Sequence, residues 1–288
     1  MFQTVLIIGS GTMGSGIAQW FAQQKAQVVC YDPFQEVTEK ANKQITFSWN
    51  KLKEKGKFSE DHVKTFHKKL SFENDLKNLM NKDFDLVLEA VPEIFELKVK
   101  LFNEVLETIN STQIVATNTS SLSIDGLCAA LPEKIKVKFC GIHFFNPAPI
   151  MKLVEIVKSK TISKALIQRM KEYFESKGKR IAVCKNSPGF IVNRVARNFY
   201  GEAFRIIKEN NTEKVEEHDS VLQEVGGFRL GPFQLMDLIG IDVNLNVTEC
   251  VWDAFYREPR FAPHPIQKSM VESGRIGKKV SKGFYKYD

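Results

Sequence analysis

The sequence predicts an α/β protein with a doubly wound, mostly parallel sheet, followed by an all-helical C-terminal domain. Three observations predict it. Short apolar, β-branched runs alternate with stretches of helical periodicity through the first part of the chain, as in a sheet covered by helices on both faces. A glycine-rich turn joins the first of these runs to the first helical stretch. Beyond about residue 187 the strand pattern stops and helical spacing takes over.

The chain begins with the most informative of these units. Residues 5–8 are a short apolar run, typical of a strand that is buried on both faces. Gly9, Gly11 and Gly14 follow with the spacing G-x-G-x-x-G, and residues 17–22 repeat apolar side chains at helical intervals. A strand, a glycine-rich turn and a helix in this order predict a dinucleotide-binding, Rossmann-like unit. The alternative is a unit of the same shape whose glycines serve packing alone.

A second apolar run, residues 28–31, leads to Asp32, eighteen residues after the last of the three glycines and close to the roughly 20 expected of the acidic residue in such a unit. Its carboxylate would accept hydrogen bonds from the ribose of an adenosine and would repel a 2′-phosphate. The N-terminus of the helix would direct free N–H groups at the phosphates. We therefore expect NAD rather than NADP as the cofactor. The residues of the turn predicted to hold it are Gly9, Gly11, Thr12, Met13 and Gly14.

A predicted helical hairpin at about residues 34–69 interrupts the strand–helix alternation. The first helical stretch ends at Gly56, and an acidic segment opens the second. The turn between them is densely basic and includes Lys53 and Lys57. On the residues alone, lysines at the negative end of a helix dipole are favoured over a binding site.

The remaining strands of the first domain lead into polar residues. Apolar runs at residues 85–91, 114–117 and 138–143 predict these strands. Ligands of a doubly wound sheet bind at the carboxyl ends of its strands, so this edge is the predicted site. The polar residues gathered there are Glu93, Asn118, Ser120 and His143.

A cluster of structure-breaking residues, Asn-Ser-Pro-Gly-Phe at 186–190, marks the predicted domain boundary. We predict a nucleotide-binding domain over residues 1–186 and a helical domain over residues 187–288.

Composition narrows the class of protein. The 288 residues suit two domains, and a hydrophobic fraction of 43% is ordinary for a globular chain. No apolar run approaches the roughly 20 residues of a membrane span, and Met1 leads directly into the first strand, so we expect neither a membrane anchor nor a signal peptide. The five cysteines are scattered without a C-x-x-C pair, which favours a reducing, cytoplasmic setting and argues against a metal site.

The formal net charge is +7. This excess favours an anionic ligand, while general solubility is the alternative explanation. Nucleic acid is not an expected partner, because the basic residues are spread along the chain and aromatic residues do not interleave with them.

His143 is the candidate general base. A dehydrogenase acting on an alcohol needs a group to take the hydroxyl proton, and of the five histidines only His143 stands at a strand end on the ligand edge. Glu155 follows on the next predicted strand, where a buried carboxylate would orient the imidazole and raise its basicity. The alternatives are a core histidine bonded to backbone and a glutamate paired with a lysine at the sheet edge. Ser120 and Asn193 could hold a substrate oxygen, or could be ordinary helix caps.

Taken together, eight motifs resemble the L-3-hydroxyacyl-CoA dehydrogenase family, most of all the bacterial 3-hydroxybutyryl-CoA dehydrogenases. The resemblance covers essentially the whole chain. The motifs are GSGTMGSGIA at residues 9–18, EAVPE at 89–93, NTSSL at 118–122, HFFNPAP at 143–149, LVEI at 153–156, SPGFIVNR at 187–194, GPFQLMDLIG at 231–240 and GFY at 283–285.

The resemblance implies NAD-dependent oxidation of an (S)-3-hydroxyacyl-CoA to the 3-oxoacyl-CoA, and the reverse, in fatty-acid metabolism. It implies that His143 is the base, that Glu155 is its partner, and that Ser120 and Asn193 contact the substrate oxygen. Two alternatives stay open: a dehydrogenase of a hydroxy acid or sugar acid without coenzyme A, and a non-catalytic NAD-binding protein.

The resemblance also implies the binding residues and the assembly. Glu93, Lys98 and Asn118 would add contacts to NAD. The hairpin would bind coenzyme A, with Lys53 and Lys57 meeting its phosphates. The C-terminal domain would close over the acyl chain and form a homodimer. The chain departs from the family pattern at residues 279–283, where Val and Ser stand in place of a small hydroxyl residue and glycine, which leaves the local turn open to question.

Overall fold

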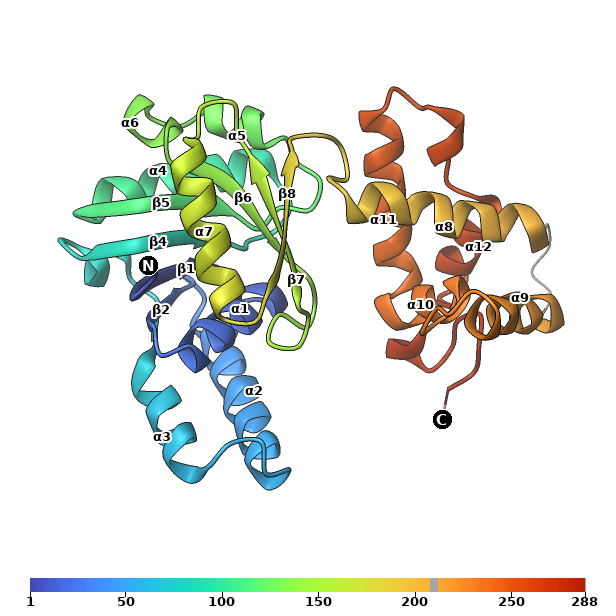
Figure 1. Ribbon diagram of the computed structural model, residues 1–288, viewed down its shortest axis with the longest axis horizontal. Coiled ribbons are helices and arrows are strands. Elements are labelled where there is room, and N and C mark those ends of the chain that lie inside the picture. The colour runs from blue at the N-terminus through green and yellow to red at the C-terminus, as the bar shows by residue number, and fades with distance from the viewer. Residues whose placement is uncertain (208–211, 288) are drawn as a thin grey trace. The chain divides into compact units, whose positions relative to one another are not determined.

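One eight-stranded sheet organises the first part of the chain (Figure 1). The computed structural model describes residues 1–207 and 212–287, and the chain divides into two units, Met1–Ser187 and Pro188–Asp288. The sheet belongs to the first unit and has the order β3-β2-β1-β4-β5-β6-β7-β8. Its strands are β1 (Thr4–Ile8), β2 (Gln27–Tyr31), β3 (Leu70–Glu73), β4 (Asp83–Glu89), β5 (Ser111–Thr117), β6 (Phe139–Phe144), β7 (Leu153–Lys158) and β8 (Arg180–Lys185).

The sheet is parallel except at one pair of strands. β6 and β7 run antiparallel, and their register places His143 opposite Glu155. All other neighbouring strands are parallel. The strand order reverses between β1 and β4, so the glycine-rich turn after β1 lies at the switch point where ligands of such sheets bind. The predicted fold class, a mostly parallel α/β sheet followed by a helical domain, is confirmed.

Helices flank the sheet, and two of them form the predicted hairpin that projects from it (Figure 1). Trp49 of α2 is fully buried, with its ring 5.6 Å from that of Phe66 of α3, so aromatic packing holds the hairpin closed. A capping box between Ser59 and His62 starts the second helix. The helices of this unit are α1 (Thr12–Gln23), α2 (Gln35–Glu54), α3 (Glu60–Lys69), α4 (Phe95–Thr108), α5 (Ile124–Ala129), α6 (Glu133–Lys136) and α7 (Lys164–Ser176).

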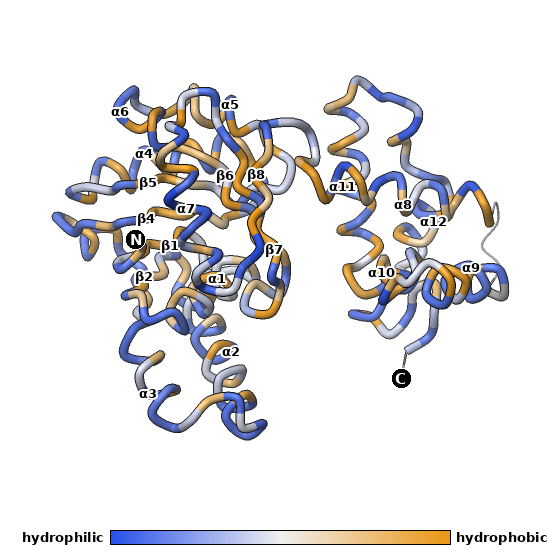
Figure 2. The backbone as a smooth tube through the Cα atoms, in the orientation of Figure 1, coloured by the Kyte–Doolittle hydropathy of each residue, from blue (hydrophilic) through white to orange (hydrophobic). Residues whose placement is uncertain are grey.

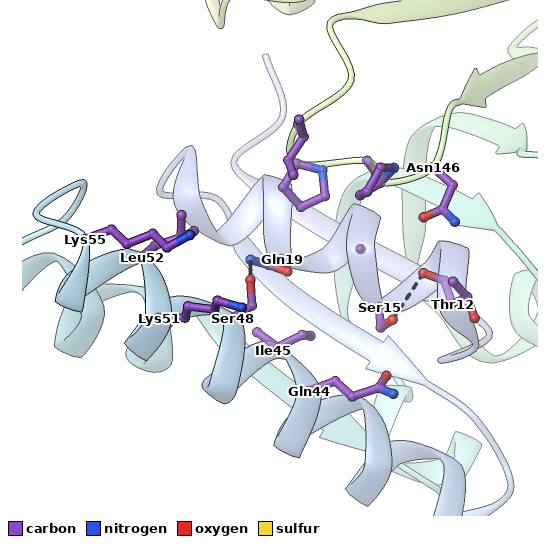
Figure 3. A pocket seen from close by; sticks show the side chains of 15 residues that line it. Thr12, Ser15, Gln19, Gln44, Ile45, Ser48, Lys51, Leu52, Lys55 and Asn146 are labelled. Atoms are coloured by element: carbon purple, nitrogen blue, oxygen red, sulfur yellow. Dashed lines mark hydrogen bonds between the residues drawn. The ribbon is translucent and has the colours of Figure 1, made fainter. Parts of the chain in front are cut away.

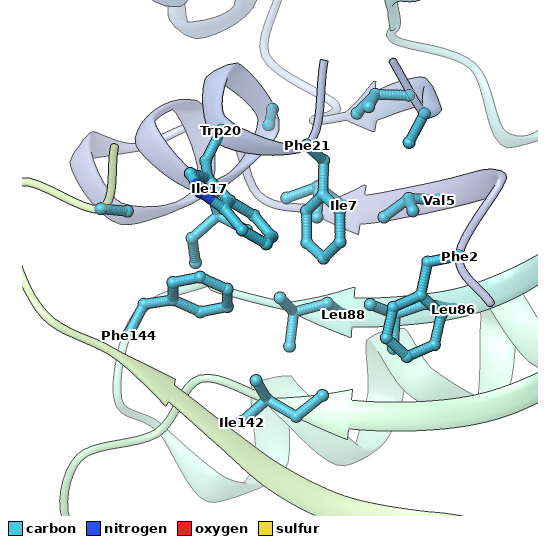
Figure 4. Close-up of a cluster of buried hydrophobic side chains, with 14 of the residues drawn as sticks. Phe2, Val5, Ile7, Ile17, Trp20, Phe21, Leu86, Leu88, Ile142 and Phe144 are labelled. Atoms are coloured by element: carbon cyan, nitrogen blue, oxygen red, sulfur yellow. The ribbon is translucent and has the colours of Figure 1, made fainter. Parts of the chain in front are cut away.

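An aromatic cluster joins α1 and α7 to the sheet. Figure 4 shows the part of it between α1 and the strands, with Trp20, Phe21 and Phe144. The rings of Trp20 and Phe174 stack 5.6 Å apart, and Phe144 of β6 lies 5.7 Å from Trp20 and 5.8 Å from Phe174. Burial of such large side chains supplies much of the hydrophobic stabilisation of a domain. In Figure 2 the inner strand β6 is hydrophobic, whereas the loops at the outer ends of β4 and β5 are hydrophilic.

The second unit is helical. Phe204, Phe233 and Phe284 form the centre of its core, which buries the C-terminal segment against α8 and α10. Within the described residues no helix is long and apolar enough to cross a membrane. The helices of this unit are α8 (Val192–Ile207), α9 (Thr212–Glu224), α10 (Pro232–Ile239), α11 (Ile241–Ala254) and α12 (Pro265–Glu272).

Asp237 of α10 fastens the C-terminal segment to this unit. Its buried carboxylate accepts hydrogen bonds from the backbone N–H groups of Phe284 and Tyr285, at 3.0 and 2.9 Å, and from the hydroxyl of Tyr287 at 2.9 Å. Burial raises the pKa of Asp237 even though these donors act to lower it. The unusual turn at residues 279–283 begins within a 3-10 helix, Lys278–Val280, and leads directly into the fastened segment.

Ser281 has a strained backbone conformation in this turn, because its φ is +55°, in the left-handed region that is unfavourable for residues with a Cβ. Ser281→Gly should raise the free energy of unfolding by about 1 kcal/mol, because glycine adopts this region without a Cβ clash. Chemical denaturation measures the change. Ser269→Gly, at an exposed position inside α12, is the control and should lower the stability by roughly 0.5 kcal/mol. A loss of stability in Ser281→Gly would contradict the expectation.

Candidate active site

The glycine-rich turn brings α1 against the end of β1. A Cβ on Gly14 would lie 1.8 Å from the carbonyl oxygen of Gly9, so only glycine permits this contact. Gly9 itself has a φ of +98°. Gly11 differs from both, because a Cβ there would meet no protein atom within 4 Å. The space beside Gly11 is thus left for a ligand, as a pyrophosphate requires.

The same turn presents an anion-binding helix end. Thr12 and Met13 are the first residues of α1, and no side chain caps this N-terminus or places an acid in its first turn. A cavity of about 430 Å³ lies beside it. Its lining residues are Ser10, Gly11, Thr12, Glu36, Val37, Lys40, Ala41 and Gln44.

Asp32 follows β2 directly and is nearly buried. Its carboxylate accepts hydrogen bonds from the backbone N–H groups of Ser10, at 2.9 Å, and Phe34, at 3.1 Å. The first of these bonds fixes the carboxylate beside the glycine-rich turn. Its place matches that of the acid that binds ribose in a dinucleotide-binding unit. An uncapped helix end, open space at Gly11 and an acid at the end of β2 together fit a bound dinucleotide.

His143 and Glu155 form a buried pair at the carboxyl end of β6. His143 Nδ1 lies 2.7 Å from Glu155 Oε2, and the exposed fractions of the two side chains are 7% and 0%. The pair is a direct consequence of register, because the two residues stand opposite each other on antiparallel strands. With Nδ1 donating to the carboxylate, Nε2 is the nitrogen that can take a proton in catalysis. The ring also lies 4.6 Å from that of Phe145.

Asn118 ties β5 to the histidine strand. Its side-chain oxygen accepts a hydrogen bond from the backbone N–H of Phe144 at 2.8 Å, next to His143. Ser120 follows two residues later at the same edge, and its backbone N–H donates to Glu93 at 2.9 Å. The structure thus gathers four of the predicted residues at the carboxyl ends of neighbouring strands.

Glu93 and Lys98 belong to a buried charge network at this edge. The side chain of Lys98 is 1% exposed, and its ammonium lies 2.6 Å from Glu89 Oε1 and 3.3 Å from Glu93 Oε2. Glu93 also accepts hydrogen bonds from Thr119 and from residues 120 and 121. Lys98 is therefore held by protein groups instead of pointing into open space.

The pKa values of Glu89 and Glu93 are shifted in opposite directions from the ordinary value of a glutamate. Burial acts to raise the pKa of Glu93, but Lys98 and the hydrogen bonds from Thr119, Ser121 and the backbone N–H of Ser120 hold it below its ordinary value. At Glu89 burial outweighs the attraction of Lys98, and the pKa is raised. The network as a whole fixes the two loops that border the predicted cofactor site.

A cleft of about 390 Å³ opens between α1, α2 and the loop that joins β6 to β7 (Figure 3). Gln19 of α1 donates a hydrogen bond to Ser48 of α2 at 3.0 Å, which bridges its two helical walls. The cleft is mainly apolar, with Lys51 and Lys55 along one side (Figure 3). Its lining residues are Thr12, Ser15, Gly16, Gln19, Gln44, Ile45, Ser48, Lys51, Leu52, Lys55, Asn146, Pro147, Ala148, Pro149 and Ile150.

The lysines of the cleft are not those chosen from the sequence. Lys53 forms an ion pair with Glu60 at 2.7 Å, and neither Lys53 nor Lys57 is among the lining residues. Sequence reasoning missed Lys51 and Lys55, although a signal was present. They continue the helical face of Gln44 and Ser48 on α2, because positions 44, 48, 51 and 55 are three or four residues apart.

Asn193, the fourth residue predicted for catalysis, lies in the second unit. It is the second residue of α8, and its carbonyl accepts a hydrogen bond from Arg197 Nε at 3.1 Å. The residue is half-buried.

Comparison with known proteins agrees with this geometry in both units. A family model described as the 3-hydroxyacyl-CoA dehydrogenase NAD-binding domain matches residues 4–187. The model of the C-terminal domain of the same enzyme matches residues 189–287. The chain belongs to the 3-hydroxyacyl-CoA dehydrogenase family. The family resemblance and the predicted NAD cofactor are confirmed.

Relatives of this dehydrogenase family come from bacteria and from mitochondria. The 3-hydroxyadipyl-CoA dehydrogenase of Escherichia coli is 41% identical over 98% of this chain, which spans 58% of that relative's length. The mitochondrial hydroxyacyl-coenzyme A dehydrogenase of Sus scrofa is 34% identical over 98% of this chain and 90% of its own length. The crystal structure of (S)-3-hydroxybutyryl-CoA dehydrogenase from Ralstonia eutropha is 32% identical, covers 100% of both chains and has a TM-score of 0.89.

Substitutions at two glycines of the turn test its role in folding and its role in cofactor binding separately. Gly14→Ala should lower the free energy of unfolding by about 3 kcal/mol, because its Cβ would overlap the backbone of Gly9. Gly11→Ala should keep the stability within about 1 kcal/mol, since open space surrounds it. It should nonetheless weaken NADH binding roughly tenfold or more, the effect of a new clash with the ligand. Chemical denaturation and NADH fluorescence titration measure the two quantities. Unchanged NADH affinity in Gly11→Ala would refute the predicted role of this glycine.

Proposed function

We propose that the chain interconverts an (S)-3-hydroxyacyl-CoA and the corresponding 3-oxoacyl-CoA, with NAD as the hydride carrier. The observation that supports this most is the buried pair of His143 and Glu155 at the carboxyl end of β6. A pair of this kind, placed on the ligand edge of an NAD-binding domain, provides a general base where an alcohol would be oxidised.

In the proposed mechanism His143 moves the proton. Nε2 accepts the proton of the substrate's 3-hydroxyl during oxidation and returns it during reduction. Glu155 holds Nδ1 in the donating tautomer and stabilises the imidazolium that forms, because an opposite charge at 2.7 Å favours the protonated ring. Ser120 and Asn193 hold the substrate oxygen by hydrogen bonds. Bound NAD would supply the acceptor for the hydride that leaves C3 of the substrate in oxidation and, as NADH, the donor in reduction.

We further propose how the cofactor is held. Asp32 binds the adenosine ribose, and the turn formed by Gly9, Gly11, Thr12, Met13 and Gly14 holds the pyrophosphate. Glu93 contacts NAD from the loop after β4. Lys98 contributes through Glu93, because its own ammonium is buried among protein acceptors. Asn118 contributes in a similar manner, through the strand that carries the base.

The cleft beside α2 is the proposed site for the coenzyme A portion of the substrate. Its apolar walls suit a pantetheine chain, and Lys51 and Lys55 suit phosphates. Thr12 and Gln44 line both this cleft and the cavity at the glycine-rich turn, so the two proposed ligand sites adjoin. This arrangement would bring an acyl group bound through coenzyme A toward the cofactor.

The names of the relatives guide the remaining proposals. One acts on a 3-hydroxyadipyl and one on a 3-hydroxybutyryl thioester, which supports a short acyl chain as substrate here. We propose that the helical C-terminal unit closes over this chain and forms a homodimer, and that the enzyme works in the cytoplasm.

The proposed function predicts that the protein oxidises NADH when acetoacetyl-CoA is added. Absorbance at the NADH band follows the reaction. NADPH should be at least roughly tenfold less effective, because Asp32 repels its 2′-phosphate. Free acetoacetate should react poorly, because it lacks the coenzyme A that the cleft would bind.

A variant of the base tests the mechanism in the same assay. His143→Gln should lower kcat by roughly 10² to 10⁴, the contribution of a general base, with NADH affinity nearly unchanged. Turnover at the wild-type rate would remove His143 from the mechanism. Equal rates with acetoacetate and acetoacetyl-CoA would instead favour a dehydrogenase that acts without coenzyme A.

Two pairs of lysines on the hairpin give different expectations for coenzyme A. Replacing Lys51 and Lys55 together by alanine should raise the KM for acetoacetyl-CoA roughly three- to tenfold, since each exposed charge contact contributes about 0.2–1 kcal/mol. Replacing Lys53 and Lys57 should change it less, because these residues do not line the cleft. Steady-state kinetics at low salt measures both. A larger effect at Lys53 and Lys57 would return the phosphate site to the turn of the hairpin.

A further inference from the structure

Lys179 is a buried lysine that the proposed mechanism does not use. It lies directly before β8 and is 5% exposed. Its ammonium donates hydrogen bonds to the carbonyl oxygens of Ala148, at 2.6 Å, and Met151, at 2.7 Å. Burial lowers its pKa to about 8. Within residues 1–207 and 212–287 it makes no ion pair with a carboxylate.

Both of its acceptors belong to the loop that joins β6 to β7. This loop begins directly after His143 and Phe144, and five of its residues line the cleft. Lys179 bonds to it at two points three residues apart. The lining residues from this loop are Asn146, Pro147, Ala148, Pro149 and Ile150.

The same ammonium also contacts the aromatic cluster beneath the loop. It lies 4.9 Å from the ring centre of Trp20 on α1 and 5.6 Å from that of Phe144 on β6. The loop packs closely on α1, because a Cβ on Gly16 would lie 3.6 Å from that of Ala148. Lys179 thus joins the loop, α1 and the strand that carries the base.

A charge in this place is costly for folding. Removing an ammonium from water without a carboxylate partner is unfavourable, and an apolar side chain of similar size often serves stability equally well. A methionine is apolar and of similar size, but it could not donate hydrogen bonds to the two carbonyl groups. The property that only the lysine supplies is therefore the fixed position of the loop.

We infer that Lys179 is a positioning residue for acyl-CoA binding, which holds the loop of residues 145–151 as one wall of the cleft. This inference rests on the proposed function, because it takes the cleft as the site of coenzyme A. Lys179 does not contact the substrate. It acts through the backbone of Ala148 and Met151, and its loss should impair binding of the thioester while leaving the proposed NAD site at the N-terminus of α1 intact.

Hydrogen exchange tests the clamp without any substrate. The amides of Ile150 and Met151 both donate to the carbonyl oxygen of Pro147, at 3.0 and 2.9 Å. In Lys179→Met they should exchange roughly tenfold faster than in the wild type, as expected on losing charge-assisted hydrogen bonds. Lys177→Met, at an exposed position two residues earlier, is the matched control and should exchange at the wild-type rate. Equal exchange in both variants would overturn the inference.

Kinetics tests the consequence for binding. Lys179→Met should raise the KM for acetoacetyl-CoA roughly tenfold, with the Kd for NADH within about twofold of the wild type. Lys179→Gln is neutral but keeps N–H donors, so its KM for acetoacetyl-CoA should lie between those of the wild type and Lys179→Met. If the methionine variant does not fold, Lys179→Gln is compared with the wild type in its place. A proportional loss of NADH and thioester affinity, or an unchanged KM in a variant with a loosened loop, would refute the positioning role.

The two hypotheses fail in different ways. If the wild type does not use acetoacetyl-CoA at all, the proposed function is wrong, while the exchange rates still decide whether Lys179 holds the loop. If the wild type is active and Lys179→Met exchanges and binds like Lys177→Met, only the role of Lys179 is wrong.

Discussion

The contact between the start of α1 and the end of β1 is the constraint on which the rest of the first unit depends. It exists only because Gly14 has no side chain to collide with the backbone of Gly9. From this fixed start, successive faces of one helix serve three purposes. Its N-terminus borders the cavity proposed for the nucleotide, Trp20 enters the aromatic cluster, and Gly16 and Gln19 form a wall of the cleft. A shift of α1 would therefore disturb the cofactor site, the core and the cleft together.

Three charged side chains are buried at the edge of the sheet that holds the carboxyl end of β6, and each is stabilised by a different kind of partner. Lys98 is neutralised by carboxylates, and the resulting network orders two loops. Glu155 is paired with an imidazole whose charge changes in the proposed reaction. Lys179 is compensated by carbonyl dipoles and aromatic rings, with no carboxylate partner among the residues that the structure describes. Burying a charged group lowers the stability of the folded protein. Several such groups at one edge of the sheet are therefore typical of a functional site, where the positions of the side chains matter more than the stability that is lost.

Much of this site was visible in the sequence, for reasons that are local. The spacing of Gly9, Gly11 and Gly14, the acid at Asp32 and the histidine at a strand end are short-range signals, because each is recognised from residues close together in the chain. The hairpin was also predicted, and the structure adds two lysines to those that the sequence singled out. The density of lysine drew attention to the turn, whereas the face packed beside α1 places Lys51 and Lys55 along the cleft.

The sequence by itself determined the fold class, the NAD-binding unit and the identity of the candidate base, since periodicity and motif spacing are properties of neighbouring residues. The tertiary structure alone decided which side chains meet. It set the register that brings Glu155 to within 2.7 Å of His143, turned Lys98 inward to its two carboxylates, and placed Lys179 under a loop about thirty residues earlier in the chain. The periodicity of apolar residues indicates that a helix face is apolar or that a strand is buried. The partner of a buried polar group depends instead on how elements distant in the sequence pack together, and only the complete fold determines that packing.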